Sequence, residues 1–291
     1  MAAKTAGQAD IRGIDIHKLV EGFAEEGIIL KNFCRVSKTS AREIRWYQKT
    51  EGFLTGPTTT AITTSLIGNT ASKALPVAVE PSYTRNTSYV RKFFAESPLI
   101  STEDLKDSDP DIWADMLRDL PRAVNYQIDT RIYAELTSAG AQTAAATQDG
   151  WDDTATGDPI LDFLTAKQKI RAKGYDTQGM ICYINSIEEK NLLHWLISVK
   201  GSSIPNFSSD KVQSGLLMEL LGVKVVVSEN ATTDQAVFFI PQKAVVWKEF
   251  TPLQTAVIDD PGIGKKVRVW AEGEAIRPNP NAVYVLTDTV T

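Results

Sequence analysis

The residue types that usually carry catalysis or bind metals are sparse in this chain. Its histidines are His17 and His194, and its cysteines are Cys34 and Cys182. None belongs to an HExxH, CxxC or histidine-rich cluster, so the spacing argues against a zinc site. His194 adjoins Trp195 on a predicted helix, which favours a structural histidine over a catalytic one. Two cysteines so far apart in sequence fit a reduced compartment.

The other chemical patterns have simpler interpretations. The stretch 262–266 (GIGKK) superficially resembles a phosphate-binding loop. It lacks the GxxxxGK[ST] spacing and leads into a predicted strand, so we interpret it as a hairpin tip. The pairs 152–153 and 259–260 are both Asp-Asp but lack the alternating oxygen ligands of a calcium loop, which favours solvated turns. The sequence therefore nominates no catalytic residue, no metal ligand and no cofactor.

Charge is the more informative pattern. Residues 38–100 hold eight basic and four acidic side chains, whereas residues 101–120 hold seven acidic and two basic ones. Carboxylates are favourable at helix N-termini, so one interpretation is a solvated acidic helix face. The other is that the basic segment of one copy lies over the acidic segment of a neighbour. That hypothesis predicts contacts between subunits at Lys49, Lys73, Arg85, Arg91, Lys92, Asp104, Asp107, Asp111 and Asp115. We expect further contacts between subunits at Asp260 and Lys265, in and beside the predicted hairpin tip.

The composition bounds the class of protein. The chain has 291 residues, 43% of them hydrophobic and 23% charged, with a net charge of −5. These values are ordinary for a globular protein with one large or two modest domains. A net negative charge argues against a protein that grips nucleic acid electrostatically, although it permits one that surrounds nucleic acid. We expect neither a signal peptide nor a membrane span, since no apolar run is long enough.

Residues 49–100 pose the main folding problem. This segment is rich in Thr, Ser, Gly and Pro, and it has no helical period. Thr and Val favour extended backbone, yet the segment holds too few large apolar residues to offset the entropy of ordering it. Its scattered Leu, Ile, Val, Phe and Tyr residues are nevertheless atypical of disorder. We therefore expect another molecule, and specifically a second copy of the same chain, to order it.

Helical periodicity marks the middle of the chain. A short helical turn over 101–105 can be capped by its serine, and the Asp-Pro pair at 109–110 is a strong start signal for a longer helix. Apolar residues recur at spacings of three and four as far as residue 137. Pro121 lies within this pattern and is expected to kink the helix or divide it in two.

From residue 159 onward the pattern alternates between helix and strand. A capping box at 186–189 (SIEE) starts one helix, and the turn DDPG at 259–262 predicts a hairpin. The predicted further helices, including one amphipathic stripe near the N-terminus, cover 15–30, 159–173, 186–197 and 211–221. The predicted strands cover 42–48, 83–94, 180–184, 223–227, 236–240, 244–247, 255–258, 265–271 and 282–286. The predicted loops cover 138–150 and 201–210.

The order of these parts resembles the tailed-phage major capsid protein of the Hong Kong 97 type. The pattern of residue types along the chain is similar over nearly its whole length, and the resemblance is strongest in five stretches. They cover residues 74–108, 124–138, 179–193, 220–231 and 236–247. The resemblance implies an α+β fold with an N-terminal arm, an extended β loop, a peripheral domain with a long spine helix, and an α/β axial domain.

The resemblance also implies domain boundaries. The expected parts are an N-terminal arm (1–41), an extended loop with flanking strands (42–98), a peripheral domain with the spine helix (99–150), an axial domain (151–242), a long hairpin of the peripheral domain (243–277) and a final strand returning to the axial domain (278–291).

By the same resemblance the chain assembles with itself, as pentamers and hexamers, into an icosahedral shell. The shell would enclose double-stranded DNA without sequence specificity. Its location would be the virion, after assembly in the host cytoplasm, and scaffolding, portal and cement proteins are candidate partners. Two alternatives stay open. One is an encapsulin-like protein compartment with the same fold, and the other is a soluble α/β enzyme with a flexible insertion.

Overall fold

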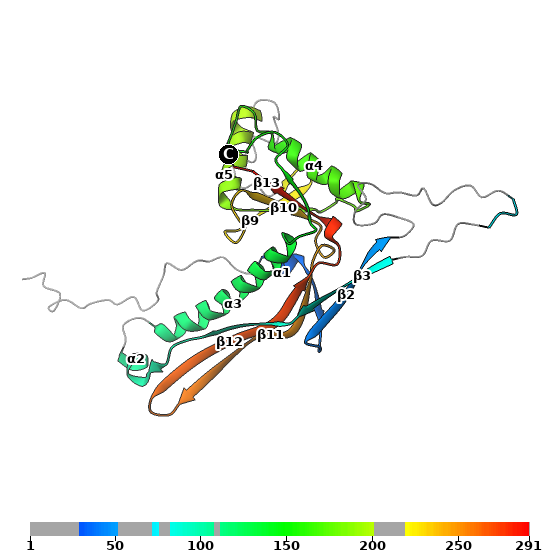
Figure 1. The fold of residues 1–291 in the computed structure, drawn as a ribbon. Coiled ribbons are helices and arrows are strands. Elements are labelled where there is room, and N and C mark those ends of the chain that lie inside the picture. Colours follow the sequence, from blue (N-terminus) through cyan, green and yellow to red (C-terminus); the bar gives the residue numbers. More distant parts are fainter. Residues whose placement is uncertain (1–28, 52–71, 76–81, 108–110, 201–218, 291) are drawn as a thin grey trace, which may run out of the picture.

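A computed structural model of the chain describes residues 29–51, 72–75, 82–107, 111–200 and 219–290. The described residues form two sheets with helices beside them and a separate two-stranded ribbon (Figure 1). This mixed architecture agrees with the predicted α+β class. The helical stripe predicted over 15–30 lies outside the described residues except for its end, where α1 (Leu30–Phe33) begins.

The first sheet is long and narrow. Its strand order is β1-β11-β12-β4, and β5 pairs with the far end of β12. The strands are β1 (Arg35–Lys38), β4 (Arg91–Glu96), β5 (Ile100–Ser101), β11 (Val246–Asp260) and β12 (Gly264–Ile276). β11 and β12 form the predicted antiparallel hairpin, and Gly262 in its turn has a φ of 82°. β11 joins two strands that the sequence predicts separately, because its intervening residues remain paired with β12.

The long helix α3 (Ile112–Leu136) lies along this sheet (Figure 1). Its buried stripe includes Ile128 and Ile132, whose spacing of four places them on one helix face. The helix begins two residues later than predicted, with Asp111 as its N-cap, and the predicted start pair at 109–110 is outside the described residues. Pro121 lies inside one continuous helix, so the predicted division is wrong. Packing of both halves against the sheet offsets the backbone hydrogen bond that proline cannot make.

A carboxylate of α3 holds the start of the described chain. Asp129 is buried and accepts backbone N–H groups from Ile29, Leu30 and Lys31, the last two at 3.0 Å. These N–H groups belong to the first turn of α1, where no earlier carbonyl of the helix can accept them. The contact ties the segment that precedes β1 to the middle of the long helix.

The second sheet forms a compact α/β unit with its helices (Figure 1). Its strand order is β6-β13-β10-β7-β9-β8. The strands are β6 (Gln142–Ala145), β7 (Ile181–Ile184), β8 (Glu219–Leu220), β9 (Val223–Val227), β10 (Gln235–Phe239) and β13 (Val283–Thr287). The helical elements are α4 (Pro159–Ala172), α5 (Ser186–Trp195) with a π-helical turn Leu196–Lys200, and the short 3-10 turn Pro280–Ala282.

Three predictions for this unit need correction. The predicted loop 138–150 contains β6, which pairs in parallel with β13 through backbone bonds that its small residues do not signal. The N-cap of α5 is Asn185, whose Oδ1 accepts the N–H of Ile187, and not Ser186. The helix predicted over 211–221 is wrong at its end, where β8 pairs with β9 across the turn at Gly222, and the rest of it is outside the described residues.

One buried cluster runs through both sheets. Phe163 of α4 meets Phe238 of β10 edge to face, with ring centroids 5.0 Å apart. Trp151 is fully buried, and its indole N–H donates to the Asp162 carboxylate at 2.9 Å. Burying each such aromatic side chain contributes about 1.5–3 kcal/mol to the stability of the α/β unit, and the same cluster continues through Trp247, Val267 and Val269 of the first sheet.

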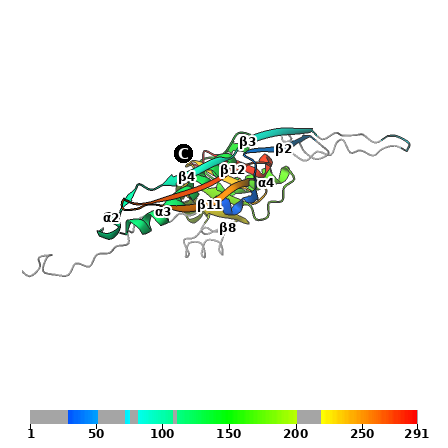
Figure 2. The same cartoon turned by 90° about the horizontal axis from the view of Figure 1, so that it is seen from below.

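The ribbon consists of β2 (Glu43–Glu51) and β3 (Ser82–Tyr89), which pair antiparallel and leave the body at its edge (Figures 1 and 2). Ile44 on its inner face packs against Val246 and Ile276 in a small separate cluster. The strands predicted over 42–48 and 83–94 are thus confirmed as β2, β3 and β4. The remaining helix α2 (Thr102–Asp107) lies at the opposite end of the long body.

Candidate assembly surfaces

The ribbon presents an outer face rich in tyrosine. Successive strand residues point to opposite faces, so the side chains of β2 and β3 divide between an inner and an outer face of the ribbon. On the outer face, Tyr47, Tyr83 and Tyr89 are 62%, 59% and 68% exposed. Arg45 and Arg85 share this face, since Arg45 lies opposite Thr87 and Arg85 lies opposite Tyr47. We name this set the tyrosine face. Tyrosine and arginine are enriched among the residues that carry binding energy in protein interfaces.

Two ion pairs lie where the ribbon joins the first sheet, one at Arg42 just before β2 and one at Arg91 at the start of β4. Arg42 lies 3.1 Å from Glu272, and Arg91 lies 3.0 Å from Glu274. Both arginines are more than 60% exposed, whereas both carboxylates, on alternate positions of β12, are nearly buried. Arg42 also stacks over Phe250 at 4.5 Å. These contacts set the direction in which the ribbon leaves the body.

Glu274 connects β4 to the long helix α3. Its Oε1 accepts from Arg131 Nε at 2.6 Å, and Arg131 also pairs with Glu135 one turn further along α3. Burial raises the pKa of Glu274 above its ordinary value, while the guanidinium groups of Arg131 and Arg91 oppose that rise. β4, β12 and α3 are therefore coupled through one carboxylate.

The acidic segment lies at the other end of the body. Ser101 Oγ accepts the N–H of Asp104 at 3.0 Å, which confirms the predicted cap of the short helix. Asp104 itself is exposed. Asp111 is exposed as well, and it accepts the N–H of Ala114 at 3.1 Å. Asp115 is nearly buried and pairs with Arg118 at 2.8 Å. Part of the acidic excess is therefore helix capping and pairing within the subunit.

The hairpin tip is the third exposed region. Ile263 is 60% exposed and Val257 is 51% exposed, although both are aliphatic. Asp260 is exposed beside them, and Lys265 lies 4.0 Å from Asp259 across the hairpin. Gly264 begins β12 and pairs with Ser101, so the stretch that resembles a phosphate loop is a hairpin tip, as predicted.

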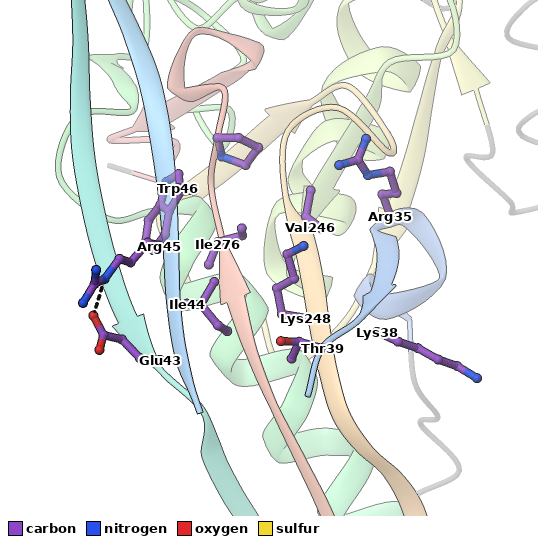
Figure 3. Close-up of a pocket in the computed structure, with 11 residues that line it drawn as sticks. Arg35, Lys38, Thr39, Glu43, Ile44, Arg45, Trp46, Val246, Lys248 and Ile276 are labelled. Carbon is purple, nitrogen blue, oxygen red and sulfur yellow. Dashed lines mark hydrogen bonds and ion pairs between the residues drawn. The ribbon is translucent and has the colours of Figure 1, made fainter. Parts of the chain in front are cut away.

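A groove runs between the ribbon base and the first sheet (Figure 3). Its volume is about 360 Å³, and we name it the loop-base groove. The lining residues come from β1, β2, β11 and the end of β12: Arg35, Lys38, Thr39, Glu43, Ile44, Arg45, Trp46, Val246, Lys248, Ile276 and Pro278. Arg45 and Glu43 pair with each other at 2.6 Å on the outer face of the ribbon, and the side chain of Lys38 points away from the groove (Figure 3). The basic side chains that face the groove are Arg35 and Lys248, which make it electropositive above an apolar floor.

The structure separates the predicted contact residues into groups. Arg85 and Lys92 are exposed, Arg91 is exposed but paired with Glu274, and Lys73 is exposed in the short described piece 72–75. The backbone of Lys49 pairs with Tyr83 in the ribbon. The side chains of Lys49 and Asp107 lie outside the described residues. The basic residues Arg85, Arg91 and Lys92 thus lie near the ribbon. The acidic residues Asp104, Asp111 and Asp115 lie at α2 and the start of α3.

Sequence reasoning missed the basic residues of the groove. Arg35 and Lys248 are far apart in the chain and meet because β1 pairs in parallel with β11. Lys38 and Arg45 do lie in the basic segment identified from the sequence, but nothing there singles them out. The alternation of β2, with Ile44 and Trp46 facing inward, was the available signal for a groove wall.

The described residues offer no competing chemical site. None of their His, Cys, Asp and Glu side chains form a group of three suited to a metal ion. Asp153 accepts from Thr156 Oγ1 at 2.6 Å and from the Ala155 N–H at 2.7 Å, which is turn geometry. Those hydrogen bonds lower the pKa of Asp153. His194 is exposed on α5, and His17 lies outside the described part of the chain. No described helix is both long and apolar enough to span a membrane.

Comparison with known proteins assigns the family. The sequence model of the family described as "Phage capsid protein" matches residues 99–286, well over half of the chain. The chain belongs to this family. Its role is accordingly that of a structural capsid protein, and the predicted alternative of a soluble enzyme is set aside. No curated protein matches the sequence.

Solved structures show the fold of this capsid protein. The cyanophage P-SCSP1u capsid matches with a TM-score of 0.70 at 12% identity, covering 96% of this chain and 93% of that one. The mature capsid of bacteriophage PhiM1 matches with a TM-score of 0.67 at 15% identity, covering 95% and 91%. A virus-like particle from Pyrococcus furiosus matches with a TM-score of 0.60 at 11% identity, covering 89% and 92%. The predicted Hong Kong 97-type fold is confirmed by these matches.

Proposed function

We propose that this capsid protein self-assembles through its ribbon into a closed icosahedral shell that encloses double-stranded DNA. The main observation in favour of assembly through the ribbon is the exposed tyrosine face. A ribbon that leaves the body with Tyr47, Tyr83 and Tyr89 exposed has little stability by itself and an outer surface suited to a protein partner. The partner is an adjacent copy, which the extended loop crosses.

The two sheets take different roles in this proposal. The first sheet with α3 is the peripheral domain, in which α3 is the spine helix and the β11–β12 hairpin reaches toward neighbouring capsomers. The second sheet with α4 and α5 is the axial domain around fivefold and sixfold centres. Exposed Ile263 at the hairpin tip supports a contact there, since an apolar side chain at an exposed tip gains from being covered.

The enclosed DNA is held by confinement and not by sequence-specific contacts. The net charge of −5 supports this, because a protein that binds DNA tightly is usually basic. Scaffolding, portal and cement proteins are further partners in this proposal, and assembly takes place in the host cytoplasm.

A protein compartment that encloses cargo proteins is the second candidate. It is favoured by the match to the virus-like particle from Pyrococcus furiosus over 89% of this chain. Particle contents separate the two: nuclease-resistant DNA supports the phage shell, and folded protein cargo supports the compartment.

The experiment is electron microscopy of particles formed by the purified chain. We expect the intact chain to form closed shells, and removal of residues 55–80 to leave a folded subunit that forms none. Tyr47→Ser with Tyr89→Ser is expected to act in the same direction. Tyr126→Ser on α3, where the tyrosine is only 36% exposed, is the matched control. Normal shells from the shortened chain would contradict the proposed role of the loop.

A further inference from the structure

The loop-base groove holds basic side chains that the described part of the subunit does not neutralise. Among the described residues, Arg35, Lys38 and Lys248 make no ion pair, and Lys248 Nζ only donates to Ser37 Oγ at 3.1 Å. Figure 3 shows Lys248 between the ribbon base and β1, with Arg35 on β1 beside it, whereas the side chain of Lys38 points away from both. Cations gathered around an apolar floor form a surface that favours an anionic occupant.

The floor of the groove is already buried within the subunit. Ile44, Val246 and Ile276 form it and are 6%, 2% and 4% exposed. The groove therefore offers an occupant mainly its charge, so a segment that brings carboxylates suits it better than an apolar one.

The chain itself contains a matching anionic segment. Residues 103–111 hold five acidic side chains and one basic one. Glu103 and Asp104 are exposed on α2 and make no ion pair with another described residue. The two charge patches thus have opposite sign, and the described charges Arg35, Lys248, Glu103 and Asp104 make no ion pair with any other described residue.

The arrangement of the fold keeps these patches apart within one subunit. α2 lies at one end of the long body, and the ribbon base lies toward the other end, in both views (Figures 1 and 2). When a rigid subunit has patches of opposite charge at its two ends, each patch can be paired only with the opposite patch of another copy. Both a head-to-tail ring and an antiparallel pair about a twofold axis use such a contact.

We infer that the loop-base groove of one subunit receives the acidic segment 103–111 of a second copy. This inference rests on the proposed assembly function and adds to it the seat of one contact between subunits. Each pair is weak because the side chains are exposed to solvent, but the contact recurs throughout a shell and so sets the register between copies.

Charge reversal with rescue tests the inference. Arg35→Glu with Lys248→Glu is expected to lower the yield of closed particles by about tenfold or more, because two repulsive pairs then recur at every contact. Adding Glu103→Lys and Asp104→Lys restores opposite charges, so the fourfold variant should recover to about the yield of the unmodified chain. Lys224→Glu with Lys243→Glu makes the same change in net charge outside the groove and is expected to leave the yield unchanged.

Several results would overturn the inference. Normal particle yield from the Arg35→Glu, Lys248→Glu variant is one, and a fourfold variant no better than the double is another. Normal shells with less DNA would assign the groove to nucleic acid. If the reversed variant does not fold, as judged by circular dichroism, the neutral Arg35→Gln, Lys248→Gln variant takes its place and should show a smaller loss. Failure of the unmodified chain to form particles would instead contradict the proposed assembly function.

Discussion

The contact between Asp129 and the first turn of α1 allows a quantitative prediction for Asp129→Asn. The side chain is 3% exposed, and both of its carboxylate oxygens are used. Oδ2 accepts from Ile29 and Leu30, and Oδ1 accepts from Lys31. Asparagine has nearly the same shape but replaces one acceptor oxygen with an NH₂ donor and removes the negative charge.

The expected loss follows from these three hydrogen bonds. In its better orientation the amide oxygen keeps the bonds to Ile29 and Leu30, and its NH₂ group faces the N–H of Lys31. An unsatisfied donor costs about 1–3 kcal/mol, and the two retained bonds lose charge assistance worth about 1 kcal/mol each. Since Lys31 is only partly buried, the lower part of the range applies to its N–H. The free energy of unfolding should therefore fall by about 3–4 kcal/mol.

Urea unfolding of the dissociated subunit, followed by the fluorescence of its six tryptophans, measures this change. Asp119→Asn on the same helix is the control, because its side chain is 45% exposed and substitution there should change stability by less than about 0.5 kcal/mol. Limited proteolysis should cut the Asp129→Asn subunit faster near residue 29. An Asp129→Asn subunit as stable as the Asp119→Asn control would refute the reasoning.

Three further predictions concern buried positions. The folded-state pKa of Glu274 is raised above 4.5, so the stability that its protonated carboxyl contributes is present below that pH and is lost as the pH rises. In urea unfolding from pH 4 to 8, the intact subunit should therefore lose stability relative to Glu274→Gln as the pH increases. A difference in unfolding free energy that stays constant over this range would contradict the expectation. Gly273→Ala would place Cβ 2.4 Å from the Trp247 ring, which should cost about 1–3 kcal/mol in thermal unfolding. Burial and the charge of Asp129 raise the pKa of Cys34 to about 12, and burial raises that of Cys182, so a thiol reagent at pH 8 should label both only after unfolding.

Local patterns in the sequence were sufficient for most elements of the fold. The amphipathic stripe of α3, the serine cap of α2 and the DDPG turn of the long hairpin each depend on residues close together in the chain. Their errors also have local causes. The small residues of β6 have no pattern that distinguishes a strand from a loop, and the start of α5 holds two candidate caps, Asn185 and Ser186. In each case a tertiary contact chose between alternatives of similar local stability.

The tertiary structure decided which charged side chains are engaged within the subunit and which remain exposed. Arg91 appears in the sequence as one of many basic residues, but the register of β4 on β12 places it against buried Glu274. Likewise Asp115 is engaged by Arg118 within its own helix, while Asp104 remains exposed.

By itself the sequence determined that this protein has a long helix, two regions of different strand pattern and a polar extended loop, because periodicity and turn residues act over a few positions. Only the tertiary structure brought Arg35 of β1 beside Lys248 of β11 under the ribbon base and set the acidic helix at the far end. Parallel pairing joins strands about 200 residues apart in the chain, and no local pattern encodes which strands will pair.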